Sequence, residues 1–171
     1  DKSRAGDEDS SFRAALKKME YWYAHHGTTV VMMTVHPEGA PEGMLEYVLR
    51  GWPTFERFCA MLGKEGVHEY AWPSLIDVSL GDTSTCARVA PPTPEMMRAE
   101  LASKVFTNQS DSDMVLALYT ATAKGFMGGI EELDYQGLGW DAAQVGVVCA
   151  WLRRCGACKR LFLGNNPMGD A

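Results

Sequence analysis

Four side chains that could take part in binding or catalysis lie close together in the sequence, after its first strongly apolar stretch. Residues 34–58 read "TVHPEGAPEGMLEYVLRGWPTFERF" and contain Tyr47, Arg50, Trp52 and Glu56. Trp52 and Glu56 are four residues apart, so they share one face if the segment is helical. A carboxylate beside an indole is partly removed from water, which raises its pKa and lets it hold or accept a proton. The same combination suits a pocket for a nucleoside or a ribosyl-nicotinamide group.

A purely structural interpretation of the same residues stays open. Trp52 and Phe55 would then be core residues of a helix that packs on a sheet. In that case Arg50 and Glu56 are solvated or paired with other charges, and the cluster binds nothing.

The order of these elements resembles a segment of Toll/interleukin-1 receptor (TIR) domains. The resemblance covers about residues 28–62: an apolar strand, a loop with Tyr47, and "RGWPTFE", in which Trp-x-x-x-Glu opens a helix. In the enzymatic members the glutamate cleaves NAD at the nicotinamide–ribose bond. The resemblance therefore implies Glu56 as the catalytic carboxylate and Trp52 as a framework aromatic. Pro53 stands where the family often has Cys, and the family's first strand and loop have no counterpart here.

The elements around this cluster alternate between helical and strand patterns. Apolar spacings of three and four predict helices over residues 11–26, 52–62, 93–105 and 110–127. Thr93 and either Ser110 or Asp111 are expected to cap the last two of these, with Pro94 in first position. Residues 28–35, "TTVVMMTV", form a continuous β-branched and apolar run, typical of a strand buried on both faces of a parallel sheet. Residues 72–80 predict a second strand. The fold class is therefore α/β, with a partial parallel βαβ layer and helices.

The carboxyl-terminal part of the chain repeats itself. "IEELDYQGLGWDAA", Ile130 to Ala143, lies over "CKRLFLGNNPMGDA", Cys158 to Ala171, at a constant offset of 28 residues. The shared frame is apolar-x-x-Leu-x-apolar, a polar turn, an apolar residue and a small residue. A fixed period of this size indicates stacked units that bury their apolar faces against one another. Chance recurrence of a strand, a turn and a helix is the alternative.

A helix is expected between the two copies. Asp141 is its predicted cap and Gly156 its predicted end, and its apolar face is expected to comprise Val145, Val148, Cys149 and Leu152. The resulting strand, turn, helix and strand resemble the ribonuclease-inhibitor class of leucine-rich repeats over about residues 128–171. Asn166 occupies the family's turn position in the second copy, whereas the first copy has Leu138 there. That difference suits an atypical, capping first repeat.

These observations predict three parts: a disordered linker over residues 1–10, an incomplete TIR-like α/β domain with a helical extension over 11–127, and the first leucine-rich repeats of a solenoid over 128–171. Stable arrays need about three repeats or more, and this chain holds one and a half. Two strands are also few for a stable sheet. We therefore expect the chain to be a piece of a longer protein.

Composition excludes several classes of function. The chain has 171 residues, a formal net charge of −6 and no dense Lys/Arg cluster, which argues against nucleic-acid binding. Its apolar stretches are too short to span a membrane. The five cysteines suggest reduced thiols in an intracellular, most simply cytoplasmic, protein; a trimmed amino end would hide an import signal. Cys155 and Cys158 form a lone Cys-x-x-Cys without further ligands, so we expect core thiols and no metal, with Cys158 at a buried leucine position.

The repeats favour protein–protein recognition as the function. Solenoids of this kind present their strand face to a partner. The residues expected there are charged: Glu131, Glu132, Asp134, Lys159 and Arg160. The sequence therefore predicts an interaction, sensor or scaffold module with a protein partner. The alternatives are a structural subunit of a larger complex, and an NAD or nucleotide N-glycosidase that uses Glu56 in a pocket framed by Tyr47, Arg50 and Trp52. NAD is expected only in that last case, and no other cofactor is expected.

Overall fold

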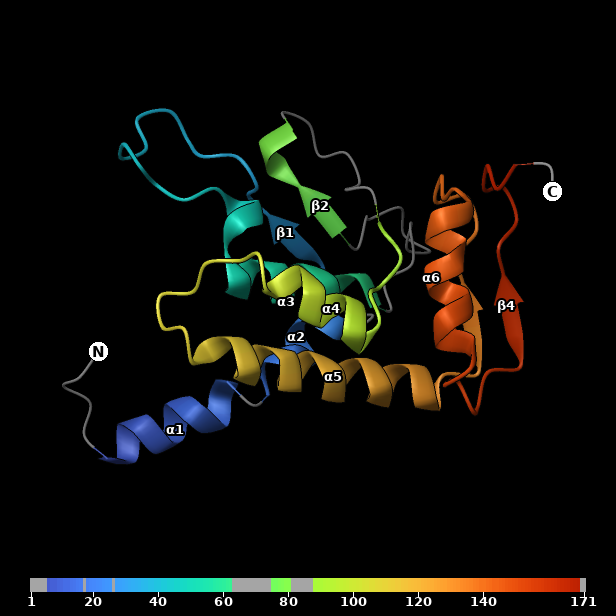
Figure 1. Ribbon diagram of the computed structural model, residues 1–171, viewed down its shortest axis with the longest axis horizontal. Coiled ribbons are helices and arrows are strands. Elements are labelled where there is room, and N and C mark those ends of the chain that lie inside the picture. Colours follow the sequence, from blue (N-terminus) through green and yellow to red (C-terminus); the bar gives the residue numbers. More distant parts are fainter. Residues whose placement is uncertain (1–5, 17, 26, 63–74, 81–87, 170–171) are drawn as a thin grey trace.

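The protein is a mixed α/β structure with short parallel strands. The computed structural model describes residues 6–16, 18–25, 27–62, 75–80 and 88–169. In Figure 1 the helices form a body with a small sheet above it, and a strand–helix–strand unit stands across the carboxyl end of the longest helix. The elements, in chain order, are α1 (Gly6–Leu16), α2 (Met19–Ala24), β1 (Val30–Met32), the 3-10 helix η1 (Tyr47–Leu49), α3 (Gly51–Leu62), β2 (Leu75–Asp77), the 3-10 helix η2 (Val78–Leu80), α4 (Pro94–Leu101), α5 (Asp111–Gly129), β3 (Glu132–Asp134), α6 (Ala142–Leu152) and β4 (Arg160–Phe162).

The amino-terminal helix differs from the sequence prediction in two ways. It is divided into α1 and α2 rather than continuous over residues 11–26. It also begins at Gly6, within the segment 1–10 that was expected to be a linker; residues 1–5 lie outside the described part. Glu8 lies in the first turn of this helix, where negative charge is favourable.

The first two strands form the expected parallel pair. Val30 of β1 lies opposite Leu75 of β2, and Met32 lies opposite Asp77. β2 is buried throughout, whereas β1 is buried only at Met32. The expectation that residues 28–35 are covered on both faces is wrong, because Val31 is 57% exposed. Met32 packs against Ala60 and Met61 of α3, whereas Val31, the preceding residue of the strand, points to the opposite face.

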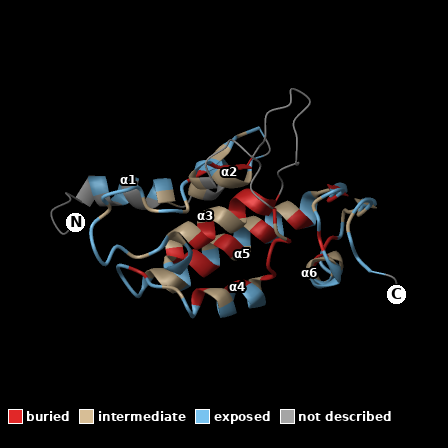
Figure 2. Cartoon of the chain, turned by 90° about the horizontal axis from the view of Figure 1, so that it is seen from above, coloured by how far each residue is buried: buried red, intermediate tan, exposed pale blue. Residues whose placement is uncertain are grey.

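The main hydrophobic core lies between α3 and α5. Figure 2 shows buried residues concentrated on these two helices, and Phe55, Cys59, Val115 and Tyr119 are all fully buried. Gly51 allows α3 to begin close to the segment after α4: its N–H donates to the carbonyl of Val105 at 3.0 Å. A Cβ on Gly51 would meet the Phe106 ring at 2.1 Å, so a side chain does not fit here.

An extended buried segment, residues 88–93, joins the helical body to the carboxyl-terminal unit. Three large aromatic side chains donate hydrogen bonds to its carbonyl groups. Trp140 Nε1 bonds the carbonyl of Arg88 at 2.6 Å, and Trp151 Nε1 bonds that of Pro91 at 2.9 Å. From the other side, the Tyr119 hydroxyl bonds the carbonyl of Pro92 at 2.7 Å. One core runs through this segment, so packing is continuous across residue 128, where the sequence suggested a domain boundary.

Arg88 ends helix α3 from within this segment. Its Nε and Nη2 donate to the carbonyls of Met61 and Leu62, both at 2.9 Å. Its guanidinium also lies over the Tyr135 ring, 4.7 Å from the centroid. A cation at the carboxyl end of a helix is favourable, because it satisfies free carbonyl groups and opposes the helix dipole.

The predicted helix starts are largely confirmed. Thr93 caps α4 by accepting a hydrogen bond from Met96 N at 3.4 Å, and Asp141 caps α6 by accepting one from Gln144 N at 2.9 Å. Ser110 precedes α5 as predicted, but its side chain makes no capping bond. None of the helices in the described part of the chain is long and apolar enough to cross a membrane.

Helix α6 corrects two further expectations. It ends at Leu152, so Gly156 lies four residues beyond its end and does not stop it. Its buried side chains are Val148 and Trp151, whereas Cys149 is exposed. The face shifts toward Trp151 because the indole reaches the buried segment 88–93.

Candidate functional site

Glu56 lies on the wall of a cavity of about 320 Å³ between α2, β1, η1 and the first turns of α3. The polar groups on this wall are Tyr23, Tyr47, Arg50, Glu56 and Arg57, and residues 30–33 with Pro53 complete it. Tyr47 is held in place by a hydrogen bond from its hydroxyl to the carbonyl of Pro53 at 3.3 Å. The structure thus brings together three of the four residues singled out in the sequence.

The surroundings of Glu56 favour the protonated form of its carboxyl group, because they raise its pKa. Burial raises its pKa, while a hydrogen bond from Tyr23 and the charge of Arg50 oppose this rise only in part. The pKa of Tyr23 is raised to about 12, first by burial and then by the neighbouring Glu56. A carboxyl group with a raised pKa beside a cavity is a candidate proton donor or acceptor for a ligand.

Trp52 does not belong to this cavity. Its indole Nε1 donates to the Asp111 carboxylate at 3.1 Å, and its ring stands edge-on to Phe55 with 6.0 Å between centroids. It therefore fastens the start of α3 to the start of α5. The indole is thus directed toward α5, and the expected role of Trp52 as the framework of a pocket around Glu56 stays a prediction. Burial and the hydroxyl of Tyr23 act on the pKa of Glu56.

Tyr23 is the site residue that the sequence did not reveal. It lies in α2, 33 positions before Glu56, in the run "MEYWYA". The sequence marks that run as amphipathic, but it does not show which of its aromatic side chains turns toward α3.

The five charged residues predicted for the strand face lie together on β3, β4 and the residues just before them. The two strands are parallel, with Glu132 opposite Arg160 and Asp134 opposite Phe162. Glu131 and Lys159 form an ion pair at 2.9 Å, and Glu132 forms a second pair with Arg160. Asp134 accepts from the backbone N–H of Gln136 at 3.0 Å. These side chains are exposed, and four of the five neutralise one another.

The turns that follow β3 and β4 share one feature of their backbone. Gly137 and Asn165 are 28 positions apart, and both have a positive φ, 64° and 59°. Asn166 then joins the two copies. Its Nδ2 donates to the carbonyls of Tyr135 at 2.7 Å and Leu163 at 2.9 Å, and its Oδ1 accepts from the N–H of Trp140 at 3.0 Å. The side chain of the second turn thus satisfies backbone groups in the first.

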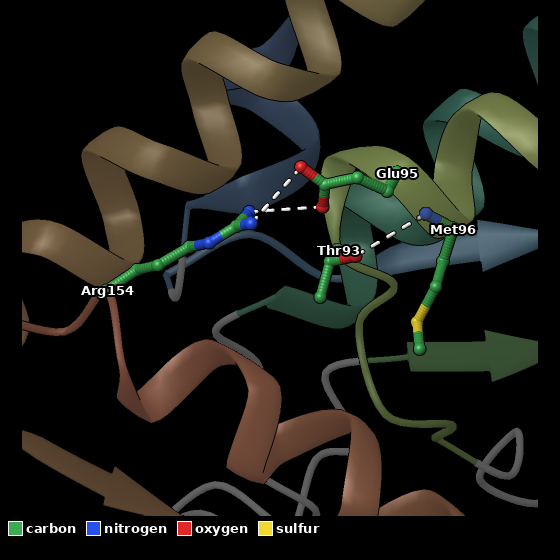
Figure 3. Close-up of polar contacts among 4 residues, drawn as sticks. All are labelled: Thr93, Glu95, Met96 and Arg154. Carbon is green, nitrogen blue, oxygen red and sulfur yellow. Dashed lines mark hydrogen bonds and ion pairs between the residues drawn. The ribbon is translucent and has the colours of Figure 1, made fainter.

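A third surface lies along α5, where two hollows of about 450 and 470 Å³ both border Lys124. One of them is bounded by Glu95 and Arg154, which Figure 3 shows facing each other beside the Thr93 cap. The Arg154 guanidinium donates to both carboxylate oxygens, at 3.1 and 3.2 Å. These bonds lower the pKa of Glu95 to about 2. The two side chains satisfy each other, and they join α4 to the turn after α6.

The cysteines differ in how far they are buried. Cys59 and Cys155 are buried, Cys149 is exposed, and Cys86 lies outside the described residues. Cys158 is only half-buried, so the expectation of a fully buried leucine position is wrong there; its Sγ donates to the carbonyl of Arg160 at 3.4 Å. Within the described ranges, no group of three or more His, Cys, Asp or Glu residues is placed to hold a metal ion.

Comparison of the chain with known protein families, with curated proteins and with solved structures gave no match.

Proposed function

We propose that the protein is an interaction module of the scaffold or sensor type. In this proposal the carboxyl-terminal stretch begins a leucine-rich-repeat solenoid, and the strand face of β3 and β4 binds a protein partner. The observation that carries it is the 28-residue offset between the paired residues of β3 and β4, together with a positive φ at the equivalent turn positions 137 and 165. Asn166 supports it further, because its bonds to the first turn are a contact between stacked units.

The ion pairs of the strand face can be replaced by ion pairs with a partner. Exposed ion pairs such as Glu131–Lys159 contribute about 0–1 kcal/mol each, so a partner replaces them at little cost. Asp134 is not paired with a cation in the described structure, and its cross-strand neighbour Phe162 is 37% exposed. An aromatic group beside a carboxylate favours a partner side chain with an apolar stem and a positive charge.

Co-purification from the source cells tests the strand face. The double variant Asp134→Ala/Phe162→Ala removes two side chains of the strand face that form no ion pair in the described structure. Lys124→Ala, on α5, is the control. We expect both variants to keep the wild-type unfolding temperature. Proteins retained by the wild type and the control should be lost from the double variant. An identical set of proteins with all three chains would contradict the proposed surface.

A second candidate function is cleavage of NAD or a nucleotide at its N-glycosidic bond. It is favoured by one specific observation: Glu56, with a raised pKa, lines a 320 Å³ cavity together with Arg50 and two tyrosines. Arg50 would attract the phosphates of the substrate, and Tyr23 or Tyr47 would contact its base.

Release of nicotinamide from NAD tests this candidate. Glu56→Gln should reduce the rate by about 100-fold or more, because a general acid or base contributes that much. Glu46→Gln, on the exposed loop before η1, is the matched control and should retain activity. A wild-type protein that releases no nicotinamide, or a fully active Glu56→Gln variant, would remove this candidate.

A further inference from the structure

We infer that the outer edge of β4 receives a further strand–turn–helix unit with two acidic residues at the positions equivalent to Lys159, just before β4, and Arg160, its first residue. The inference rests on the proposed solenoid, and it names the chemistry of the unit that stacks next.

The parallel pairing of β3 with β4 leaves the other edge of β4 able to pair with a further strand. Beyond the strands themselves, Tyr135 N donates to the carbonyl of Phe162 at 2.9 Å and Gly137 N donates to that of Gly164 at 3.0 Å. Residues 160 and 162 direct their backbone groups to β3, so the N–H and C=O of Leu161 point to the opposite edge. No strand pairs with that edge in the described part of the chain. A parallel strand in the same relation would satisfy it.

The apolar side chains at equivalent positions of the two copies are buried to different extents. In the first copy, Leu133 and Trp140 are 2% and 3% exposed, because the second copy and the helical body cover them. In the second copy, the equivalent Leu161 is half-buried and Met168 is 40% exposed. A unit with the same apolar frame would cover both residues, as the second copy covers the first.

The charges at this edge make it selective for the strand that pairs with it. Two acidic residues, Glu131 just before β3 and Glu132 in it, have basic partners 28 positions later: Glu131 pairs with Lys159, and Glu132 pairs with Arg160. A strand on the other side of β4 would place its own equivalent residues next to these two cations. Acidic residues would extend the alternation of charge, whereas basic residues would repel Lys159 and Arg160.

The test extends the full chain by one unit copied from residues 144–171. In one version the copied strand keeps Lys-Arg, and in the other it carries Glu-Glu. We expect amides of β4 to be protected from hydrogen exchange in the acidic version. Its folding equilibrium constant should exceed that of the basic version by roughly threefold to tenfold, from two cross-strand pairs, with a smaller ratio at high salt.

A charge-exchanged host provides the control. The variant Glu131→Lys/Glu132→Arg/Lys159→Glu/Arg160→Glu keeps the ion pairs within the chain but reverses the sign at the edge. In this host the basic extension should be the more stable one. Equal stability of both extensions, with β4 protected in each, would overturn the charge selectivity and leave the solenoid standing. If neither extension protects β4, the solenoid fails, and this inference fails with it.

Discussion

Two buried tyrosines give the sharpest test of how the carboxyl-terminal unit is held. Tyr119 and Tyr135 are 0% and 1% exposed, so they bury the same chemical group to the same extent. The Tyr119 hydroxyl donates to the carbonyl of Pro92 at 2.7 Å, whereas the Tyr135 hydroxyl has no hydrogen-bond partner in the described structure. Replacing each with Phe removes one oxygen atom and leaves the ring in place.

The two substitutions should therefore have different effects on stability. Tyr119→Phe removes a hydrogen bond and leaves a buried carbonyl of segment 88–93 without its donor, which costs about 1–3 kcal/mol. Tyr135→Phe removes a hydroxyl group that loses its bonds to water on folding and gains none in return. We expect it to change the free energy of unfolding by about 0 kcal/mol, or to increase it slightly.

Urea unfolding followed by tryptophan fluorescence measures both changes, because Trp140 and Trp151 also bond to this segment. Hydrogen exchange should show faster opening of residues 88–93 in Tyr119→Phe only. A loss of more than about 1 kcal/mol in Tyr135→Phe would refute the reasoning, since it would mean that this hydroxyl has a partner.

Further predictions concern close packing, the turn and acid stability. Gly51→Ala should destabilise the fold by about 1–3 kcal/mol because its Cβ meets Phe106, whereas Gly125→Ala, with open space in helix α5, should stabilise it by about 0.5–1 kcal/mol; thermal unfolding compares them. Asn166→Ala removes three bonds to backbone groups and should cost about 2 kcal/mol, while Asn165→Gly, which relieves a positive φ, should be close to neutral in urea unfolding. The pKa of Glu95 falls on folding from 4.5 to about 2, so the stability it supplies is present above pH 4.5 and is lost as the pH falls toward 2. Unfolding temperatures of wild type and Arg154→Gln should therefore differ at neutral pH and converge near pH 2; a constant difference would contradict this assignment.

Local features of the fold could be predicted from the sequence. Thr93 and Asp141 cap their helices because a cap depends on the side chain and the next three residues. The 28-residue register of β3 and β4 was also predictable, since the same frame of apolar residues occurs twice. The two ion pairs follow from that register.

Features that depend on distant partners could not be predicted. The orientation of Trp52 is determined by Asp111, and the pairing of Glu95 with Arg154 joins residues equally far apart in the sequence. For the same reason the sequence identified Glu56 but not Tyr23, which contacts it from α2. The exposure of β1 was missed because a continuous apolar run does not show that only one face of the strand is covered.

The central claim is that the strand face of β3 and β4 binds a protein partner. Photo-crosslinking tests it most directly, with a crosslinking phenylalanine derivative in place of Phe162 and, as a control, in place of the exposed Met96 on α4. We predict that position 162 forms a discrete protein adduct in the source cells, that Asp134→Ala abolishes this adduct, and that position 96 does not form it. The same adducts at both positions, or none at position 162, would contradict the claim.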